Sequence, residues 1–306
     1  MFFKRLFQPN QLTQRKEETP EAKEDIHFLT TNLVLNDRYL IERALSKNIY
    51  LAVDLQNERR SVVVKHIKFN FRKTASLKRS RYRFDREMIE LAKISESCTI
   101  IPKLIDYFSD RESSGNFYIV YEYIEGQNIA DELTDLQKRK SELSTVRLLK
   151  QILLQLQILH HRDVVHDEID PTQIIRRASD GQIIFLYYGN IKKIFWDLLN
   201  DEIIDDGNHT LINIGFPFSC RSPESLARRA SFCTDIYAVG WIGIQSVVDI
   251  SLRDLPEDVL TGEYQWRKYC NIDERLIKIL TKMTEISVRY RYQNITEVLK
   301  DIDLLI

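Results

Sequence analysis

Apolar residues in the first half of the chain fall into short runs that are separated by polar breaks. These runs are 39–44, 49–55, 61–67, 104–108 and 117–122. Each run has the length of a β-strand, and the short breaks between neighbouring runs favour antiparallel pairing. Residues 82–94 instead carry apolar side chains at helical spacing, at Phe84, Met88 and Leu91. The pattern predicts an antiparallel sheet with one helix behind it.

Beyond Gly126 the spacing of apolar residues becomes helical. Apolar side chains recur every three or four residues from Val146 to Leu159. A helix is expected there, with Ser144 or Thr145 as its N-cap.

Two further helical regions follow. Residues 235–250 are almost wholly apolar, so this helix must be buried on all sides. Residues 272–306 carry two more amphipathic helices. Together with the β-rich first part, this predicts an α+β chain with a β-rich lobe and a helical lobe, divided at residues 122–126.

The start of the chain differs from the rest in composition. Residues 8–25 are rich in Gln, Lys, Glu and Pro and have almost no apolar side chains that burial could order. Residues 1–26 are therefore predicted to be a disordered tail and linker. The stretch from Met1 to Phe7, M-F-F-K-R-L-F, is basic and aromatic. Two interpretations of it stay open: a frayed terminus, or a weak contact with a membrane surface or a partner.

Composition narrows the class of protein. The 306 residues are 43% hydrophobic, which is enough for a sizeable core. The net charge of -1 gives no general attraction to nucleic acid. The four cysteines form no CxxC pair, which argues against a zinc site and a disulfide framework. No stretch has the apolar length of a membrane span. These features predict a cytoplasmic protein that does not bind nucleic acid.

One stretch, residues 164–189, combines a polar loop with two short strands. Pro171 fixes the loop, and a turn at residues 179–181 joins apolar residues 174–175 to residues 183–186. This is the order of a catalytic loop followed by a metal-binding loop.

The frame of this stretch resembles that of the protein-kinase family, in particular bacterial serine/threonine kinases of the eukaryotic type. H-D-E-I-D-P-T-Q and Y-Y-G stand where that family has H-R-D-L-K-P-x-N and D-F-G. The resemblance covers residues 36–306. It implies a bilobal protein-kinase-like fold with an N-lobe over 36–122, a hinge at 122–126 and a C-lobe over 127–306.

Other motifs extend the resemblance. Lys65 in V-V-V-K matches the lysine that holds nucleotide phosphates, and Glu87 matches its helix partner. The resemblance implies a nucleotide pocket lined by Ile49, Val63, Glu122, Ile124 and Ile175. It also implies structural roles for His166, Tyr188, Gly189, Glu224, Asp235 and Arg291, with Glu224 and Arg291 as an ion pair. A single lysine on a strand or glutamate on a helix is more often a solvated charge. The assignment of Lys65 and Glu87 therefore depends on the order of all the motifs.

The triplet His161–Arg162–Asp163, which spells H-R-D, lies just upstream of residues 164–189. No asparagine follows it at the spacing of the metal ligand, whereas the proline and the strand pair align with His166 and its neighbours. The triplet is interpreted as the turn that follows the helix ending near Leu159.

The chemistry at the matched positions departs from the family. Glu168 stands at the base position with a longer side chain, and Asp170 replaces the lysine that contacts the transferred phosphate. Gln173 replaces the metal-binding asparagine. Tyr187 replaces the metal-binding aspartate, and a neutral phenol is a poor magnesium ligand. The carboxylate of Asp167, in place of an arginine, would repel a phosphorylated activation segment.

The nucleotide pocket also departs from the family pattern. Residues 44–52, at the position of the phosphate loop, contain no glycine and are too few for a full loop. Val63 replaces a small alanine beside the adenine, and Tyr121 is bulky. Weak adenine affinity is the expectation.

These departures predict a pseudokinase, a binding or scaffolding module that acts on another protein without phosphotransfer and needs no cofactor. The alternative is a divergent serine/threonine kinase that uses ATP and Mg²⁺ through Glu168 and Gln173. A third interpretation, nucleotidyl transfer on the same fold, has little support in the sequence.

Overall fold

The structure is a computed structural model that describes residues 29–46, 48–68, 74–109, 115–139, 141–167, 169–186, 192–193, 221–227, 229–258 and 261–306. The predicted tail at 1–26 lies outside the described residues, as do Glu168, Tyr187, Tyr188 and Gly189.

The predicted antiparallel sheet is present and has six strands in the order β1-β2-β3-β4-β6-β5. The strands are β1 (Val34–Leu35), β2 (Tyr39–Ser46), β3 (Ile49–Asp54), β4 (Arg60–Lys68), β5 (Leu104–Ser109) and β6 (Asn116–Glu122). All neighbouring pairs are antiparallel. The apolar runs of the sequence therefore marked β2 to β6, and only the two-residue β1 was missed.

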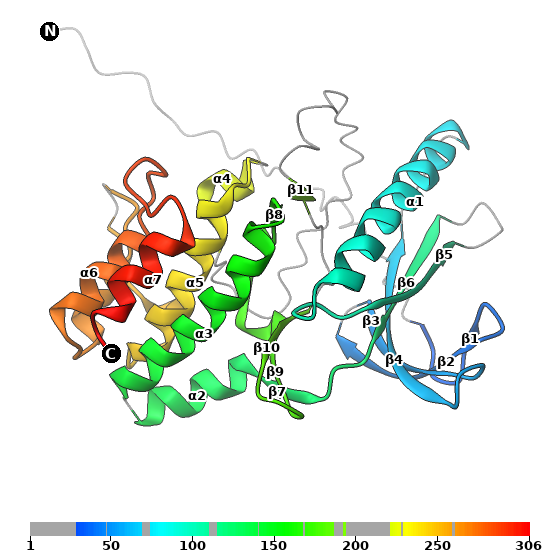
Figure 1. Cartoon of the computed structure of the whole chain (residues 1–306), viewed down its shortest axis with the longest axis horizontal. Helices are drawn as coiled ribbons and strands as arrows, with labels where there is room; N and C mark the ends of the chain where they lie inside the picture. Colours follow the sequence, from blue (N-terminus) through cyan, green and yellow to red (C-terminus); the bar gives the residue numbers. More distant parts are fainter. Residues whose placement is uncertain are drawn as a thin grey trace, which may run out of the picture.

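Helix α1 (Thr74–Ser97) lies against this sheet, with Phe84, Met88 and Leu91 buried (Figure 1). The predicted range of 82–94 was too short. The added first turns are rich in Lys, Arg and Ser and have few apolar side chains, so periodicity could not mark them. Long, unbranched basic residues are nevertheless good helix formers.

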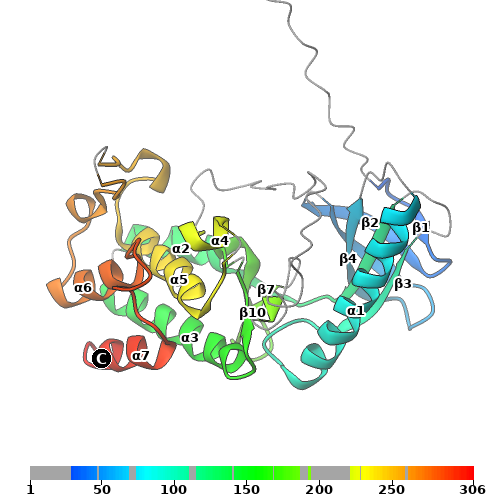
Figure 2. The ribbon, with the colours of Figure 1, turned by 90° about the horizontal axis from the view of Figure 1, so that it is seen from above.

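The second lobe is mainly helical. Its helices are α2 (Ile129–Arg139), α3 (Glu142–His160), α4 (Pro223–Leu226), α5 (Phe232–Val247), α6 (Glu274–Met283) and α7 (Ile295–Asp303). Three 3-10 turns are η1 (Pro171–Gln173), η2 (Leu252–Asp254) and η3 (Trp266–Tyr269). Figures 1 and 2 show the sheet with α1 at one end of the molecule and these helices at the other. The bilobal α+β prediction is confirmed.

A small sheet lies where the lobes join, in the order β10-β9-β7. Its strands are β7 (Gly126–Asn128), β9 (Ile174–Arg177) and β10 (Ile183–Phe185). The β9–β10 hairpin was predicted, but β7 was missed because its three residues carry no apolar side chain. Gly126 must remain small, since a Cβ there would lie 2.2 Å from the carbonyl oxygen of Arg176. Two short strands, β8 (Val164–Val165) and β11 (Lys192–Lys193), pair separately.

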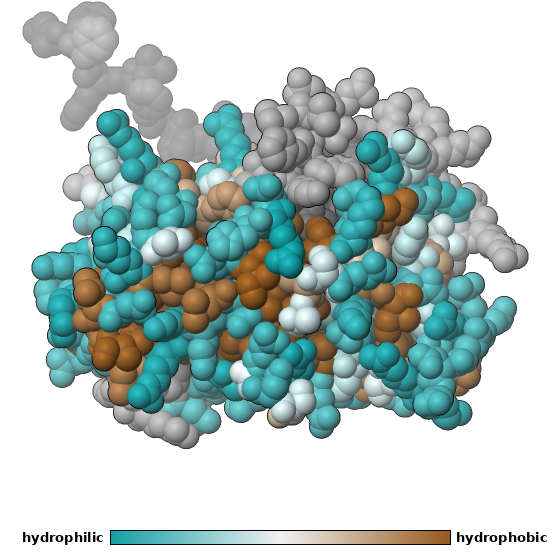
Figure 3. Space-filling model, in the orientation of Figure 1, coloured by the Kyte–Doolittle hydropathy of each residue, from teal (hydrophilic) through white to brown (hydrophobic). Residues whose placement is uncertain are grey.

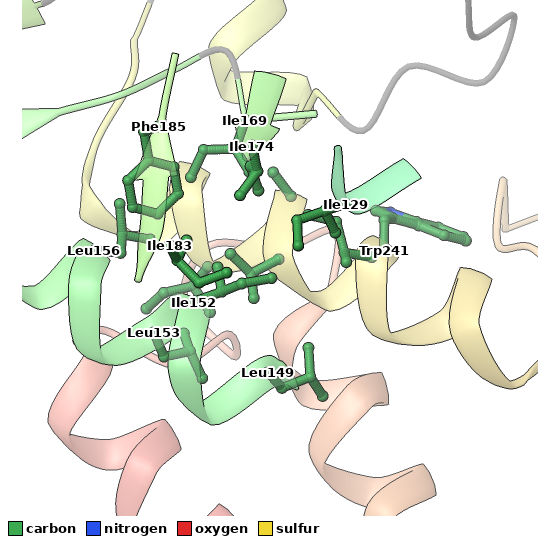
Figure 4. Close-up of a cluster of buried hydrophobic side chains, with 14 of the residues drawn as sticks. Ile129, Leu149, Ile152, Leu153, Leu156, Ile169, Ile174, Ile183, Phe185 and Trp241 are labelled. Atoms are coloured by element: carbon green, nitrogen blue, oxygen red, sulfur yellow. The ribbon is translucent and has the colours of Figure 1, made fainter. Parts of the chain in front are cut away.

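Helices α3 and α5 form the centre of the helical lobe, and β9 and β10 pack on them (Figure 4). The α5 helix is buried nearly all round, as its apolar sequence predicted, but it spans Phe232–Val247 rather than 235–250. It begins earlier because Ser231 and Thr234 form a capping box. It ends earlier because Val248 is extended.

The predicted N-cap of α3 was wrong. Helix α3 begins at Glu142, and Ser141 is the N-cap, whose side chain accepts the backbone N–H of Ser144. Thr145 lies inside the helix, where its buried hydroxyl accepts a hydrogen bond of 2.9 Å from Ser246 on α5. Three hydroxyl residues stand close together here, so sequence alone could not select the cap.

The outer sheet contains a buried ion pair that links its first turn to β3. Arg38 donates to both carboxylate oxygens of Asp54, at 2.8 and 2.7 Å. The Arg38 hydrogen bonds lower the pKa of Asp54 below its ordinary value of 3.8, and they outweigh the burial that raises it.

We expect the free energy of unfolding to fall as the pH drops below about 4, because a carboxylate with a lowered folded-state pKa loses its stabilising contribution on protonation. Urea denaturation from pH 6 to pH 3 measures this dependence. Asp54→Asn should flatten it, whereas Asp85→Asn, at an exposed position on α1, should leave it unchanged. Identical pH profiles for the two variants would contradict the assignment.

Candidate functional site

The phosphate-loop position of the family is a tight hairpin in this chain. Strands β2 and β3 remain paired up to Ser46 and Ile49, which leaves residues 47 and 48 as the connection. The carbonyl oxygen of Asn48 accepts the backbone N–H of His66 at 2.8 Å. The predicted shortening is confirmed. A connection of two residues without glycine has too few free N–H groups to surround a phosphate.

The structure places Lys65 and Glu87 on the elements that the resemblance implies. Lys65 is half-buried on β4, opposite Ile49 and Ile119 in the neighbouring strands. Glu87 is exposed on α1, one residue before the buried Met88. Their predicted roles in holding nucleotide phosphates stay predictions.

The residues assigned to the adenine pocket lie on the six-stranded sheet, in the connection between the lobes and on β9. Val63 and Tyr121 are paired across β4 and β6 and are only 2% and 1% exposed. Ile49 on β3 and Ile175 on β9 are half-buried, and Ile124 in the connection is buried. Bulky branched or aromatic side chains therefore stand at the positions that the resemblance assigns to the adenine pocket.

The connection between the lobes is held by polar contacts at both ends. The carboxylate of Glu122 accepts the backbone N–H of Lys103 at 3.1 Å and lies 3.5 Å from Arg60. At the other end, the carbonyl oxygen of Glu125 accepts the N–H of Ala178 at 2.9 Å. The side chain of Glu122 thus has a structural role, which sequence analysis did not predict.

The loop after β8 is anchored by Asp235, which is 1% exposed on α5. Its carboxylate accepts the backbone N–H groups of His166 and Asp167, both at 2.9 Å. It also lies 2.9 Å from Nε2 of His160 at the end of α3. Asp167 has a left-handed φ of 60°, which this pair of hydrogen bonds holds in place. His160 was not identified from the sequence, because its partner lies 75 residues away.

Within the same loop, Asp170 caps the 3-10 turn η1. Its carboxylate accepts the backbone N–H of Thr172 at 2.8 Å and the Thr172 hydroxyl at 2.5 Å. Asn128 on β7 donates to the carbonyl oxygen of Thr172, and the carbonyl oxygen of Gln173 accepts the N–H of Leu186. Asp170, at the position of the phosphate-contacting lysine, therefore stabilises the loop and adds negative charge to it.

The upstream H-R-D triplet has no part in this loop. His161 is the C-cap of α3, and residues 161–163 form the turn between α3 and β8. Arg162 points back and donates to the carbonyl oxygens of Ile158 and Ser97, both at 3.0 Å. The interpretation of the triplet as a turn is confirmed.

The ion pair predicted between Glu224 on α4 and Arg291 is present. Arg291 is 2% exposed and also donates to the carbonyl oxygens of Cys233 at 3.0 Å and Glu285 at 2.8 Å. Burial raises the pKa of Glu224, but the hydrogen bonds from Arg291 and Ser222 together with the neighbouring charge outweigh it, and the net pKa is lowered.

The described residues contain no cluster of three or more His, Cys, Asp or Glu side chains that could hold a metal ion. The residues at the two metal positions of the family are Gln173 and Tyr187. Gln173 keeps the amide oxygen of the family's asparagine on a longer side chain, whereas the neutral phenol of Tyr187 does not match the carboxylate oxygen that Mg²⁺ prefers. No helix in the described part of the chain is long and apolar enough to cross a bilayer.

Comparisons with known proteins agree on one family. Residues 47–301 match the family described as protein kinase domain. Serine/threonine-protein kinase C of Synechocystis sp. is 30% identical over 278 residues, which are 88% of this chain and 50% of that protein. Serine/threonine-protein kinase B of the same organism is 28% identical, over 72% of this chain and 38% of that protein. The chain spans about half the length of these curated relatives, or less.

Solved kinase structures share the fold. The structure titled PpkA-294 apo form has a TM-score of 0.61 and 17% identity, and the match covers 90% of this chain and 99% of that one. The PknI kinase domain of Mycobacterium tuberculosis has a TM-score of 0.58 and 16% identity, covering 91% and 100%. At such identities the likeness concerns the fold alone.

Proposed function

This chain belongs to the protein kinase domain family, and from that premise we propose that it is a pseudokinase, a binding or scaffolding module that acts on another protein without transferring phosphate. The observation that carries the proposal is the two-residue hairpin between β2 and β3. Phosphoryl transfer in this fold depends on positioning and on neutralising the charge of the phosphates. A hairpin closed by residues 47 and 48 has no room for the backbone cradle that this requires.

The chemistry of the loop supports the same proposal. Asp170 places a carboxylate where transition-state stabilisation needs a positive charge. Glu168 and Tyr187 also replace the family's base and metal ligand, although they lie outside the described residues. Because the phenol of Tyr187 stands where the family has its metal-binding carboxylate, the proposed function involves no Mg²⁺. A protein partner, and a weak membrane contact of Met1 to Phe7, stay predictions from the sequence.

The fold explains how such a chain can keep its architecture without the reaction. Asp235 holds the loop after β8, and the pair of Glu224 and Arg291 holds α4 to the helical lobe. Neither arrangement needs a nucleotide. The alternative is a divergent serine/threonine kinase, and the names of the Synechocystis relatives keep it as the competing hypothesis.

We expect millimolar ATP with Mg²⁺ to leave the melting temperature of the purified chain unchanged. A nucleotide present at one hundred times its Kd would stabilise the fold by about 2.7 kcal/mol, which a thermal shift detects readily. Phosphate transfer from radiolabelled ATP to the chain or to a generic protein substrate should likewise remain at background.

Two strand variants serve as controls for this prediction. Lys65→Ala changes the phosphate-binding position, and Lys68→Ala changes an exposed lysine at the end of the same strand. Magnesium-dependent phosphorylation that Lys65→Ala abolishes and Lys68→Ala preserves would overturn the proposal in favour of the divergent kinase. A thermal shift without magnesium dependence would retain a binding module but assign it a nucleotide ligand.

A further inference from the structure

A hollow of about 220 Å³ lies on the outer side of α6. The inner side of this helix carries its buried residues, Leu276, Ile279, Leu280 and Met283, which pack on the helical core. Figures 1 and 2 place α6 at the end of the molecule opposite the outer sheet, away from the junction of the lobes. We refer to this hollow as the α6 groove.

Two other segments border the α6 groove. Arg267 of η3 donates to the hydroxyl of Thr281, near the middle of α6, at 3.0 Å. Nζ of Lys282, the next residue, lies 4.0 Å from the ring centroid of Tyr292, which follows the loop between α6 and α7. The groove therefore has α6 as its base, with η3 and the loop before α7 beside it.

Three cations of the groove lie around Thr281. Arg267 is bonded to its hydroxyl, Lys282 follows it in the chain, and Lys278 lies one turn before it on the same face of α6. None of the three cations forms a salt bridge within the described part of the chain. Positive charges that no local carboxylate neutralises favour an anionic ligand.

The hydrogen-bonding groups at this point are donors. Because the Thr281 oxygen accepts from Arg267, its own O–H remains available to donate, and no described residue accepts it. The guanidinium of Arg267 has further N–H groups that bond to no described residue. A phosphoryl group bound to a hydroxyl carries a charge of about −1.5 to −2 and three acceptor oxygens. It can therefore accept hydrogen bonds from the arginine, the threonine and the two lysines together.

Two carboxylates near the ends of the groove restrict the ligand further. Glu274 lies in the first turn of α6, and Glu285 lies just beyond its last turn, where its carboxylate accepts the backbone N–H of Ser287 at 3.2 Å. A peptide with several acidic residues in a row would bring one of them against Glu274 or Glu285. The groove therefore suits a single anionic group with basic or neutral residues beside it.

The size and the apolar surface of the groove also limit the class of ligand. A volume of about 220 Å³ is below the roughly 300–1,000 Å³ of small-molecule sites, so the groove suits one side chain better than a whole nucleotide. Tyr290, which is 66% exposed, and the half-buried Ile277 offer apolar contacts to a neighbouring residue of the ligand. Figure 3 shows hydrophilic and hydrophobic side chains next to each other at this end of the helical lobe.

We propose that the α6 groove binds a phosphorylated serine or threonine side chain of a protein partner. The phosphoryl oxygens accept hydrogen bonds from Arg267, Thr281 and the two lysines. The glutamates near the ends of the groove favour a basic residue beside the phosphorylated one. The inference rests on the proposed function only in that the partner is a protein, and it names the group on that partner which is recognised.

Binding of phosphopeptides to the purified full chain tests this proposal. An array presents peptides with one central phosphoserine or phosphothreonine among varied neighbours, each beside its unphosphorylated counterpart. We expect the phosphorylated peptides to bind, with Lys or Arg preferred next to the phosphorylated residue and with an affinity that falls as salt is raised. If no phosphorylated peptide binds more tightly than its counterpart, the proposal is wrong.

Variants of the groove show where the peptide binds. The tightest peptide of the array is labelled with fluorescein, and its Kd is measured by fluorescence anisotropy. Arg267→Ala, and the double variant Lys278→Ala with Lys282→Ala, should each raise the Kd at least about tenfold, because each removes charge-assisted hydrogen bonds. Lys300→Ala changes an exposed lysine of α7 outside the groove and should leave the Kd unchanged. An equal Kd for the double variant and Lys300→Ala would overturn the assignment.

Other carriers of phosphate are tested in the same way. Vesicles that contain a phosphoinositide and free ATP are each titrated against the labelled peptide. If either binds more tightly than every phosphopeptide and loses this affinity in the double variant, the groove recognises a lipid or a nucleotide and the proposal is wrong. Failure of phosphopeptide binding would leave the pseudokinase proposal intact, whereas phosphorylation that Lys65→Ala abolishes would overturn that proposal without affecting the groove.

Discussion

Arg291→Leu is expected to lower the free energy of unfolding by about 3–5 kcal/mol, the usual cost of removing one partner from a buried ion pair. The substitution leaves the Glu224 carboxylate without its cation in a largely buried site. It also removes the donors to the carbonyl oxygens of Cys233, Glu285 and Ile286. Urea denaturation followed by circular dichroism measures the change.

Two variants separate the ion pair from the other contacts of Arg291. Glu224→Gln removes the negative charge but keeps Arg291 bonded to the three carbonyl oxygens, so it should cost less than Arg291→Leu. Arg275→Ala removes an exposed arginine whose pair with Asp273 is open to solvent, and it should have no measurable effect. Equal stability of Arg291→Leu and the unmodified chain would show that this pair does not hold α4 to the helical lobe.

The pKa of Glu224 adds a pH dependence to this prediction. Because its pKa is lowered in the folded chain, the pair stabilises the fold at pH values above the ordinary carboxyl pKa of 4.5 and loses that contribution as the pH falls through the folded value. The difference in stability between the unmodified chain and Glu224→Gln should therefore shrink in acid.

Apolar runs in the sequence correctly predicted the strands and helices that form from neighbouring residues. The run 49–55 became β3, and the apolar run from residue 235 became the buried part of α5. Asp170 before Pro171 could also have been identified as a cap, since Asp followed by Pro is a common start of a helical turn. The motif order placed Glu224 opposite Arg291 although 67 positions separate them.

What the sequence could not supply are contacts whose partners share no local pattern. Strand β7 exists because its backbone pairs with β9, and its own side chains are polar. The capping hydroxyl of α3 was selected among three neighbours by tertiary contacts, which placed Thr145 against Ser246. His160 at the end of α3 meets Asp235 only after α3 and α5 have packed together. Such long-range contacts need coordinates.

In the loop after β8, the contacts that hold the backbone are distinct from the side chains at the family's catalytic positions. Asp235 on α5 accepts hydrogen bonds from the backbone N–H groups of His166 and Asp167. These contacts do not depend on the side chains that would face a substrate. Replacement of those side chains therefore need not alter the loop. The carboxylate of Asp170 stabilises η1, and its negative charge would repel a phosphate group at this position. A loop with this framework can persist in a chain that serves as a binding module.

Asp235→Leu is the second substitution for which we expect a large effect, a loss of at least about 3 kcal/mol in the free energy of unfolding. The variant leaves two buried backbone N–H groups and the His160 ring without their acceptor, and each unsatisfied buried group costs about 1–3 kcal/mol. The leucine side chain has nearly the same size, so the loss would come from hydrogen bonds and not from a cavity.

Asp235→Asn is the matched control, because its amide oxygen can still accept one or two of the three hydrogen bonds, and its cost should lie between those of the unmodified chain and Asp235→Leu. Hydrogen exchange of residues 164–167 provides a local readout. Exchange in Asp235→Leu should accelerate in this loop more than in β3 and β4, because the carboxylate holds only the loop and not the outer sheet. If hydrogen exchange accelerates equally in both lobes, Asp235 stabilises the whole fold and not the loop alone. If exchange in the loop is unchanged, the two backbone N–H groups have other acceptors. A selective loss of protection in residues 164–167 is the expected result if the backbone of this loop depends on α5 and not on a bound nucleotide.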